Sequence, residues 1–122
     1  MADNKQYITH VKDEGRILIS EDVLATIAVQ ALAVIEGFEG LSNEPGADIV
    51  DLIGKKNWGK GIKVTICEND DVLIECNVAI TYGHSVVAVA NAIQDAVANV
   101  IRSMAGVSAV NVNVNVCGII RQ

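Results

Sequence analysis

The C-terminal part of the chain contains an unbroken alternation of valine and asparagine over residues 110–116. Successive side chains of a β-strand point to opposite faces, so this segment predicts a strand with one valine face and one asparagine face. The valine face needs a covering layer. The asparagine face is polar and uncharged, which favours contact with another protein. The pattern therefore predicts a sheet that is covered on one side only, and it indicates a scaffold before an enzyme.

Composition narrows the class of protein further. A chain of 122 residues is large enough for one domain with a core of its own. Hydrophobic residues make up 51% of the chain and aromatic residues only 3%, so the core must consist of Val, Ile, Leu and Ala. Nucleic-acid binding is disfavoured, because single strands need aromatic stacking platforms and phosphates need a positive field, whereas the net charge is −6.

No segment has the length and composition of a membrane anchor or a signal peptide. Residues 1–16 are polar and charged, and the longest apolar stretch, residues 23–35, is interrupted by Thr26 and Gln30. A bilayer span needs about 20 apolar residues. We therefore expect a cytoplasmic protein without direct membrane insertion, whose membrane association would require a partner.

The order of periodic segments predicts one domain over residues 15–118, after a polar arm at 1–14 and before a tail at 119–122. Residues 15–19 are expected to form a short strand. A helix follows, capped by Ser20 and ended by Gly37. A long loop spans 37–61, two strands cover 62–67 and 72–80, and a second helix runs from about 86 to its end at Gly106. The valine–asparagine strand closes the domain.

The turn between the two middle strands can be predicted from register. A two-residue loop would place their apolar residues on opposite faces of the sheet. A three-residue loop, 68–70, pairs Ile66 with Val72 and Val64 with Ile74, which keeps these residues on one face. One residue of slip turns every side chain over, so we expect the odd-length loop.

These elements predict an α+β fold, a two-layer sandwich in the order strand-helix-strand-strand-helix-strand. Two amphipathic helices can cover only one face of a mixed four-stranded sheet. The strand order stays open at this stage. The uncovered face is expected to carry Lys63, Thr65, Glu75, Asn77, Ala79, Thr81, Asn111, Asn113 and Asn115.

Two groups of polar residues are candidate binding surfaces. The first is the interface candidate on the uncovered face, Asn111, Asn113, Asn115, Asn77 and Thr65, for which plain exposure to water is the alternative. The second is a glycine-flanked lysine cluster that could bind an anion or an acidic partner, or could simply be a solvated loop. It comprises Lys55, Lys56, Lys60 and Lys63.

Catalytic and metal-binding patterns are weak. His84 precedes a helix start and could serve in acid–base chemistry, but no nucleophile has a fixed sequence relation to it. Cys67 and Cys76 fall on opposite faces of the sheet, so they should not converge on a metal ion; we expect these two and Cys117 to be reduced and inert. No phosphate-binding or dinucleotide-binding glycine motif is present. We expect no cofactor, no metal and no catalytic site.

Several short motifs together resemble the alkaline shock proteins, also called envelope stress response proteins of Gram-positive bacteria. The resemblance covers about residues 15–118 and rests on the sequences at 15–20, 80–83, 93–97, 104–106 and 110–114. Ala105 stands where this family commonly has threonine. The resemblance implies a non-enzymatic, self-associating cytoplasmic protein, held near the membrane in some cases by a separate membrane-embedded anchor protein.

The resemblance leaves a second function open. Another branch of that family is associated with control of fatty acid synthesis through acetyl-CoA carboxylase. The sequence thus predicts a homo-oligomeric stress or envelope scaffold, with the alternative of a regulator that binds an enzyme or an anionic partner through the lysine cluster.

Overall fold

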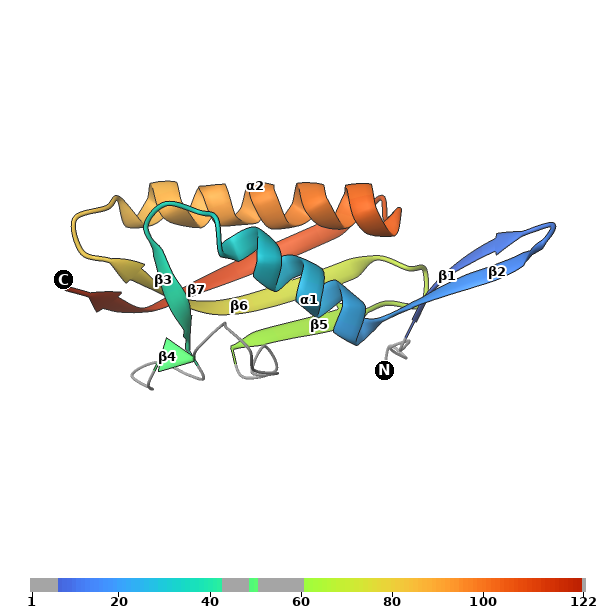
Figure 1. The fold of residues 1–122 in the computed structure, drawn as a ribbon, viewed down its shortest axis with the longest axis horizontal. Helices are drawn as coiled ribbons and strands as arrows, with labels where there is room; N and C mark the ends of the chain where they lie inside the picture. Colours follow the sequence, from blue (N-terminus) through green and yellow to red (C-terminus); the bar gives the residue numbers. More distant parts are fainter. Residues whose placement is uncertain (1–6, 43–48, 51–60, 122) are drawn as a thin grey trace.

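The computed structural model describes residues 7–42, 49–50 and 61–121 (Figure 1). Its elements follow in the order β1 (Tyr7–Lys12), β2 (Gly15–Ser20), α1 (Glu21–Leu32), β3 (Phe38–Ser42), β4 (Ile49–Val50), β5 (Ile62–Ile66), β6 (Val72–Thr81), α2 (Val86–Ala105) and β7 (Val110–Ile120).

The main sheet is built around β6. Strand β7 runs parallel to β6 along its whole length on one side. On the other side, β5 pairs antiparallel with Val72–Cys76, and β3 pairs antiparallel with Val78–Ile80. The short β4 extends the sheet beyond β3. This mixed sheet and the two helices confirm the predicted α+β class, while β3 and β4 are additional strands within the segment 37–61 that we expected to be a loop.

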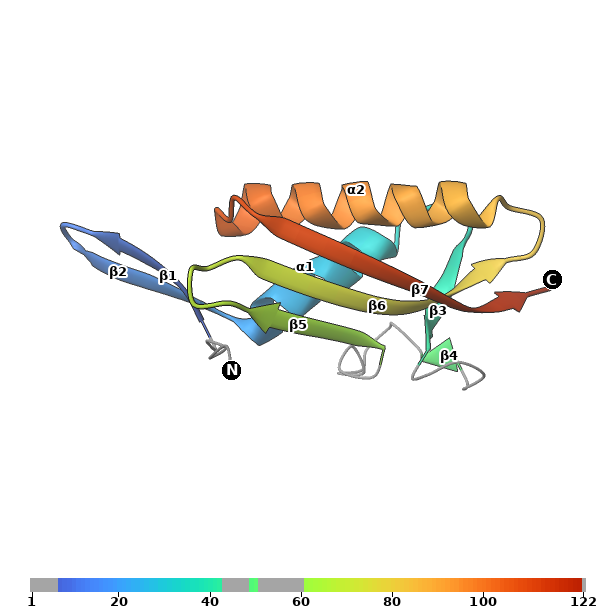
Figure 2. The same ribbon diagram turned by 180° about the vertical axis from the view of Figure 1, so that it is seen from behind.

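The first predicted strand is present but does not belong to the main sheet. Residues 15–20 form β2, which pairs with β1 from the segment 1–14 that we expected to be a polar arm. The two strands make a separate hairpin that projects from one end of the body (Figures 1 and 2). The prediction of a sheet containing residues 15–19 is therefore wrong. The reason is that all six residues of β2 pair with β1, so the preceding segment of the chain takes the backbone hydrogen bonds of this strand.

The hairpin between β5 and β6 has the predicted register. Ile66 pairs with Val72 and Val64 with Ile74. The Cys67 amide donates to the Asp71 carbonyl at 2.8 Å and the Asp70 amide to the Cys67 carbonyl at 2.9 Å, which closes the three-residue loop. Asp70 has a φ of 68°, the left-handed conformation that such loops need at their last position.

Both helices pack on the same face of the main sheet, as the two opposite views show (Figures 1 and 2). The β-layer contributes its fully buried apolar side chains to this interface, and each helix contributes one apolar stripe. The core comprises, among others, Ile66, Val72, Ile74, Cys76, Val78 and Ile80 from the sheet, Leu24, Ala28 and Leu32 from α1, and Ile93, Val97 and Ile101 from α2.

The predicted cap Ser20 and the predicted end Gly106 are both confirmed. The hydroxyls of Ser20 and Ser85 accept from the amides of Val23 and Ala88, so both serines are N-caps. Gly106 ends α2 in the left-handed conformation, with a φ of 70°. Helix α1 instead ends at Leu32, before the expected cap Gly37, because the chain turns there to bring β3 beside β6.

Three further expectations need correction. Helical spacing of the apolar residues over 86–104 predicts a buried stripe that begins at Val86 and ends at Met104. These two residues are instead 39% and 64% exposed, since they lie in the first and last turns of α2. Ala79 was expected on the face of the sheet that the helices leave uncovered, but it is only 2% exposed. It lies at a register shift between β6 and β7, where it pairs with Gly118. The predicted tail begins inside β7, which continues to Ile120.

Candidate functional site

The face of the main sheet turned away from the helices carries the predicted interface residues in aligned rows across the strands. One row is Thr65, Leu73 and Asn111, and the next is Lys63, Glu75 and Asn113. A third joins Asn77 to Asn115. We call these eight residues the open face. Alternation along each strand places them there, opposite the buried valines and isoleucines.

The open face is polar, and its charges are few. Asn111, Asn113 and Asn115 are exposed, whereas Thr65, Leu73, Glu75 and Asn77 are half-buried. The amide of Asn115 donates to the side-chain oxygen of Asn77 at 2.9 Å, so the strands are also linked by side chains. Lys63 and Glu75 are cross-strand neighbours of opposite charge. Such a surface can exchange hydrogen bonds with a flat partner.

Leu73 is the open-face residue that our reading of the sequence missed. It lies between Thr65 and Asn111 and adds an apolar centre to the first row. The available signal was the alternation along β6. Ile74 and Cys76 point to the buried face, so Leu73, which directly precedes Ile74, points to the opposite face.

Only one residue of the lysine cluster lies within the described chain. Lys55, Lys56 and Lys60 lie outside the described residues, and Lys63 is exposed on the open face. No observation of the structure therefore favours the anion-binding alternative.

His84 lies in an exposed position at the start of α2. Its Nε2 atom is 3.8 Å from an oxygen of Glu36, a carboxylate that is 93% exposed. An ion pair in water at that distance contributes little and organises no substrate site. Within the described chain, no group of three or more His, Cys, Asp or Glu side chains could hold a metal ion.

The three cysteines occupy the positions expected from strand parity. Cys76 is fully buried under the helices, while Cys67 and Cys117 are half-buried and all three are free thiols. Burial raises the pKa of the Cys76 thiol from 9.0 to about 12. This thiol therefore stays protonated and unreactive in the folded protein at ordinary pH.

Alkylation should distinguish the buried thiol of Cys76 from the half-buried thiols of Cys67 and Cys117. We expect iodoacetamide at pH 8 to label at most Cys67 and Cys117 in the folded protein, and all three cysteines after unfolding in guanidinium chloride, as counted by mass spectrometry. Because the Cys76 thiol ionises at lower pH in the unfolded chain, it should make stability fall as pH rises above about 9. Labelling of Cys76 in the native protein as fast as in the unfolded chain would contradict its burial.

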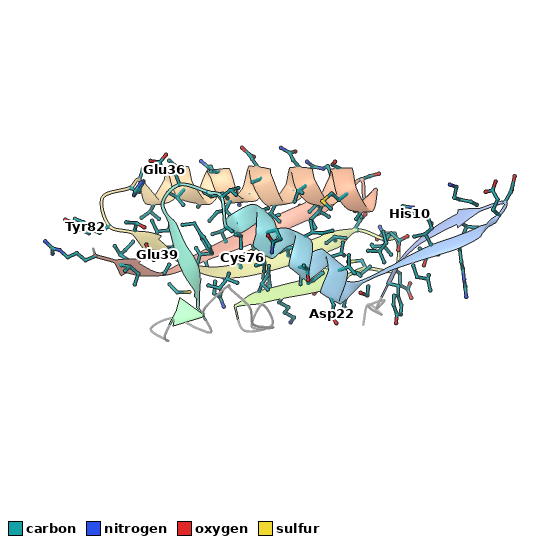
Figure 3. All side chains as sticks on the ribbon, in the orientation of Figure 1. His10, Asp22, Glu36, Glu39, Cys76 and Tyr82 are labelled. Atoms are coloured by element: carbon teal, nitrogen blue, oxygen red, sulfur yellow. The ribbon has the colours of Figure 1, made fainter. Side chains whose placement is uncertain are left out.

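The β1–β2 hairpin is a second surface feature, which the sequence analysis missed. Ile8 anchors it in the core at 1% exposure, and the His10 ring hydrogen-bonds the Ala105 carbonyl at the end of α2 at 2.8 Å (Figure 3). The available signal was the β-branched residues Ile8, Thr9 and Val11, which precede the turn-forming segment 13–15.

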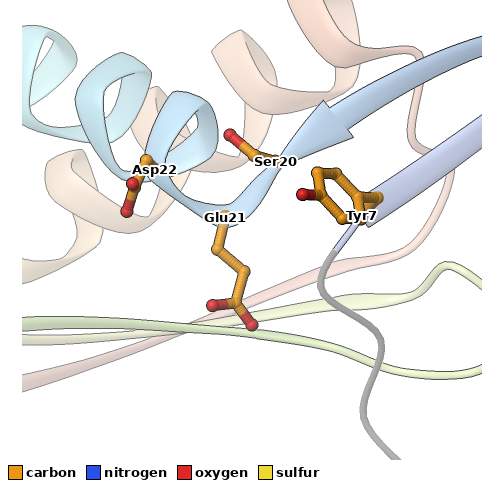
Figure 4. A pocket seen from close by; sticks show the side chains of 4 residues that line it. All are labelled: Tyr7, Ser20, Glu21 and Asp22. Carbon is orange, nitrogen blue, oxygen red and sulfur yellow. The ribbon is translucent and has the colours of Figure 1, made fainter.

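A shallow hollow lies where the hairpin meets α1. Tyr7, Ser20, Glu21 and Asp22 line it (Figure 4). The two carboxylates already complement the positive end of the α1 dipole, and Ser20 already caps the helix, so the hollow has little attraction for a further anion.

Comparison with known proteins settles the family. Residues 9–121, most of the chain, match the alkaline shock protein 23 family, which is described as having a cell envelope-related function. The chain belongs to this family. The match confirms the resemblance found in the sequence motifs, and the family is not a known enzyme family.

Similar curated proteins come from Bacillus and Streptococcus. The chain is 28% identical to the uncharacterized protein YqhY of Bacillus subtilis, over 86% of this chain and 77% of that protein. It is 33% identical to the uncharacterized protein Spy1535 of Streptococcus pyogenes, over 88% and 81%, and 26% identical to the uncharacterized protein YloU of Bacillus subtilis, over 86% and 88%. No solved structure matches the chain. Neither helix in the described part of this family member is long and apolar enough to cross a bilayer.

Proposed function

We propose that this protein is a non-enzymatic, self-associating scaffold whose open face binds the open face of a second copy. The observation that carries the proposal is a flat surface of aligned amides on the one side of the sheet that the helices leave uncovered. Amides provide both donors and acceptors, so the same residues can serve on both sides of a symmetric contact.

The charges of the open face support a second copy as the partner. Lys63 and Glu75 lie side by side in one row. A two-fold axis that lies in the plane of the contact and runs along the strands, between β5 and β6, places each Lys63 opposite the Glu75 of the other copy. The pairs are then complementary without any further charge. Leu73 in the adjacent row supplies apolar area near the centre of the contact.

The cell envelope-related role of the family extends this proposal to location. We infer that the assembled protein acts in the cytoplasm and is held at the membrane by a membrane-embedded anchor protein. Fractionation of cells with and without candidate anchor proteins tests this inference; recovery in the soluble fraction in every strain would contradict it.

The substitution Asn113→Lys tests the open-face contact. It places a third charge in the row of Lys63 and Glu75 and sets lysines of the two copies close together. Like charges brought together across an interface are strongly unfavourable, so we expect the dissociation constant of this contact to rise at least about tenfold, equivalent to about 1.4 kcal/mol. Sedimentation velocity over a range of protein concentrations measures the change.

Asn91→Lys is the matched control. Asn91 is exposed on α2, in the other layer of the molecule, and the chemical change is identical. We expect this variant to assemble like the wild type. A wild-type protein that is monomeric at every concentration, or equal weakening by both variants, would refute the open-face contact.

A further inference from the structure

The large apolar side chains that are exposed within the described chain gather at the two opposite ends of the molecule. One group belongs to the hairpin and the adjoining ends of α1 and α2: Tyr7, Val11, Ile17, Leu18, Val23 and Met104. The other belongs to the end where β6 and β7 finish and α2 begins: Val34, Tyr82, Val86, Val87 and Ile119. Figure 3 shows these ends apart, with His10 near the first and Tyr82 and Glu36 at the second.

The hairpin has one face that packs against the body and one that is largely exposed. Cross-strand pairing puts Ile8, His10, Ile17 and Ile19 on the first face. There Ile8 is buried and His10 bonds to the end of α2, while Ile17, nearer the tip, is 49% exposed. The opposite face carries Tyr7, Val11 and Leu18, which are 44%, 78% and 46% exposed, together with Arg16. We call this second face the hairpin face. Apolar residues on both faces of a two-stranded hairpin are typical of an element that is covered on each face, here by the body of the molecule on one face and by a partner on the other.

The opposite end offers a surface of matching character. Val86 and Val87 open α2, and Tyr82 lies just before it with Arg121 stacked 5.2 Å from its ring centre. The turn after α1 adds Val34, which is 84% exposed, and the exposed carboxylate of Glu36. The position of Gly37 against Val89 and His84 fixes this turn beside the first turns of α2. We call this surface the α2 end.

We propose that the hairpin face of one copy docks on the α2 end of the next copy. The apolar groups then cover each other, and Arg16 of the hairpin meets the negative charge of Glu36. A symmetric hairpin-to-hairpin contact would leave the α2 end exposed, whereas this one contact covers exposed apolar residues at both ends of the molecule. The contact joins two different surfaces, so it propagates from copy to copy and builds a chain of molecules.

This proposal shares with the open-face contact only the premise that the partner is a second copy. The two surfaces differ, so each contact can fail alone. The end-to-end contact is therefore tested in protein that also carries Asn113→Lys, which weakens the open-face contact, at protein concentrations below the dissociation constant of that weakened contact.

Two substitutions address the two ends separately. Val11→Glu and Val87→Glu change exposed side chains, and a glutamate in the first turn of a helix complements its dipole, so the fold should be retained. We expect each variant alone to raise the dissociation constant at least about tenfold, an effect of about 1.4 kcal/mol, in sedimentation velocity. A mixture of the two should form a one-to-one complex, since the first keeps an intact α2 end and the second an intact hairpin face.

Asn99→Glu is the control for added negative charge, because Asn99 is exposed on α2, between the two ends. We expect it to leave assembly unchanged, with circular dichroism verifying the fold of every variant. A charge exchange gives an independent readout: Arg16→Glu should weaken the contact and Glu36→Arg in the partner should restore it. Asn113→Lys protein that is monomeric at all concentrations, or a mixture that forms no complex, would overturn the end-to-end contact.

Discussion

Replacing Ile74 with alanine should destabilise the protein more than any substitution on the open face. Ile74 lies on the central strand β6, between Val64 of β5 and Val112 of β7, and it is fully buried beneath the helices. Truncation removes its apolar contacts and leaves a cavity that a close-packed core cannot fill. We expect the free energy of unfolding to fall by about 2–5 kcal/mol, measured by urea denaturation at one fixed protein concentration.

Leu73→Ala is the matched control, because Leu73 is the neighbouring residue of the same strand and points to the open face. It is only half-buried, so its truncation leaves no closed cavity. We expect a loss smaller than that of Ile74→Ala by at least about 1 kcal/mol. Both variants are measured at a protein concentration below the dissociation constant of the open-face contact, where a second copy does not cover Leu73. Equal losses at the two positions would then mean that both faces of the sheet are covered within one molecule, contrary to the two-layer architecture.

Gly37→Ala should produce the second large effect, although it adds only one methyl group. Gly37 has a φ of 92°, and a Cβ atom there would lie 2.8 Å from a methyl carbon of Val89 and 3.1 Å from ring atoms of His84. The backbone conformation costs about 1–2 kcal/mol for a residue with a side chain, and overpacking costs about 1–3 kcal/mol more. We expect a total loss of about 2–5 kcal/mol in urea denaturation.

Gly83→Ala separates the two causes. Gly83 has a φ of 103°, but a Cβ atom there would have nothing within 4 Å, so this variant carries the backbone cost alone. The double variant Gly37→Ala/Val89→Ala should lose less than the sum of its single variants, since the shorter side chain relieves the collision. Equal losses for Gly37→Ala and Gly83→Ala would show that the turn is not packed against α2.

Local patterns were enough to predict the secondary structure that carries the open face. The alternation over 110–116 and in the two middle strands assigns the two faces of β5 and most positions of β6 and β7. Apolar parity also predicted the hairpin loop at 68–70, because only one register puts both apolar sets on one face. The caps Ser20, Ser85 and Gly106 act within one helical turn, so they too could be predicted.

Other features depend on partners far away in sequence. Ala79 looked like an open-face residue, but it is 2% exposed in the structure, where it pairs with Gly40 of β3 and Gly118 of β7. Gly37 looked like a helix cap, but it serves the close approach of the turn to α2. The candidate interface was predicted in part: Asn111, Asn113, Asn115, Asn77 and Thr65 share one face as expected, while Leu73 was missed.

The amino-acid sequence by itself determined which side of each strand is apolar, where the helices begin and how the middle hairpin is registered. These properties follow from the two-residue period of a strand and from hydrogen bonds within a single turn. Only the tertiary structure decided that β1 and β2 pair with each other outside the main sheet and that β3 pairs with β6. Strand partnership is a competition between distant segments for the same backbone hydrogen bonds, and no local pattern encodes its outcome.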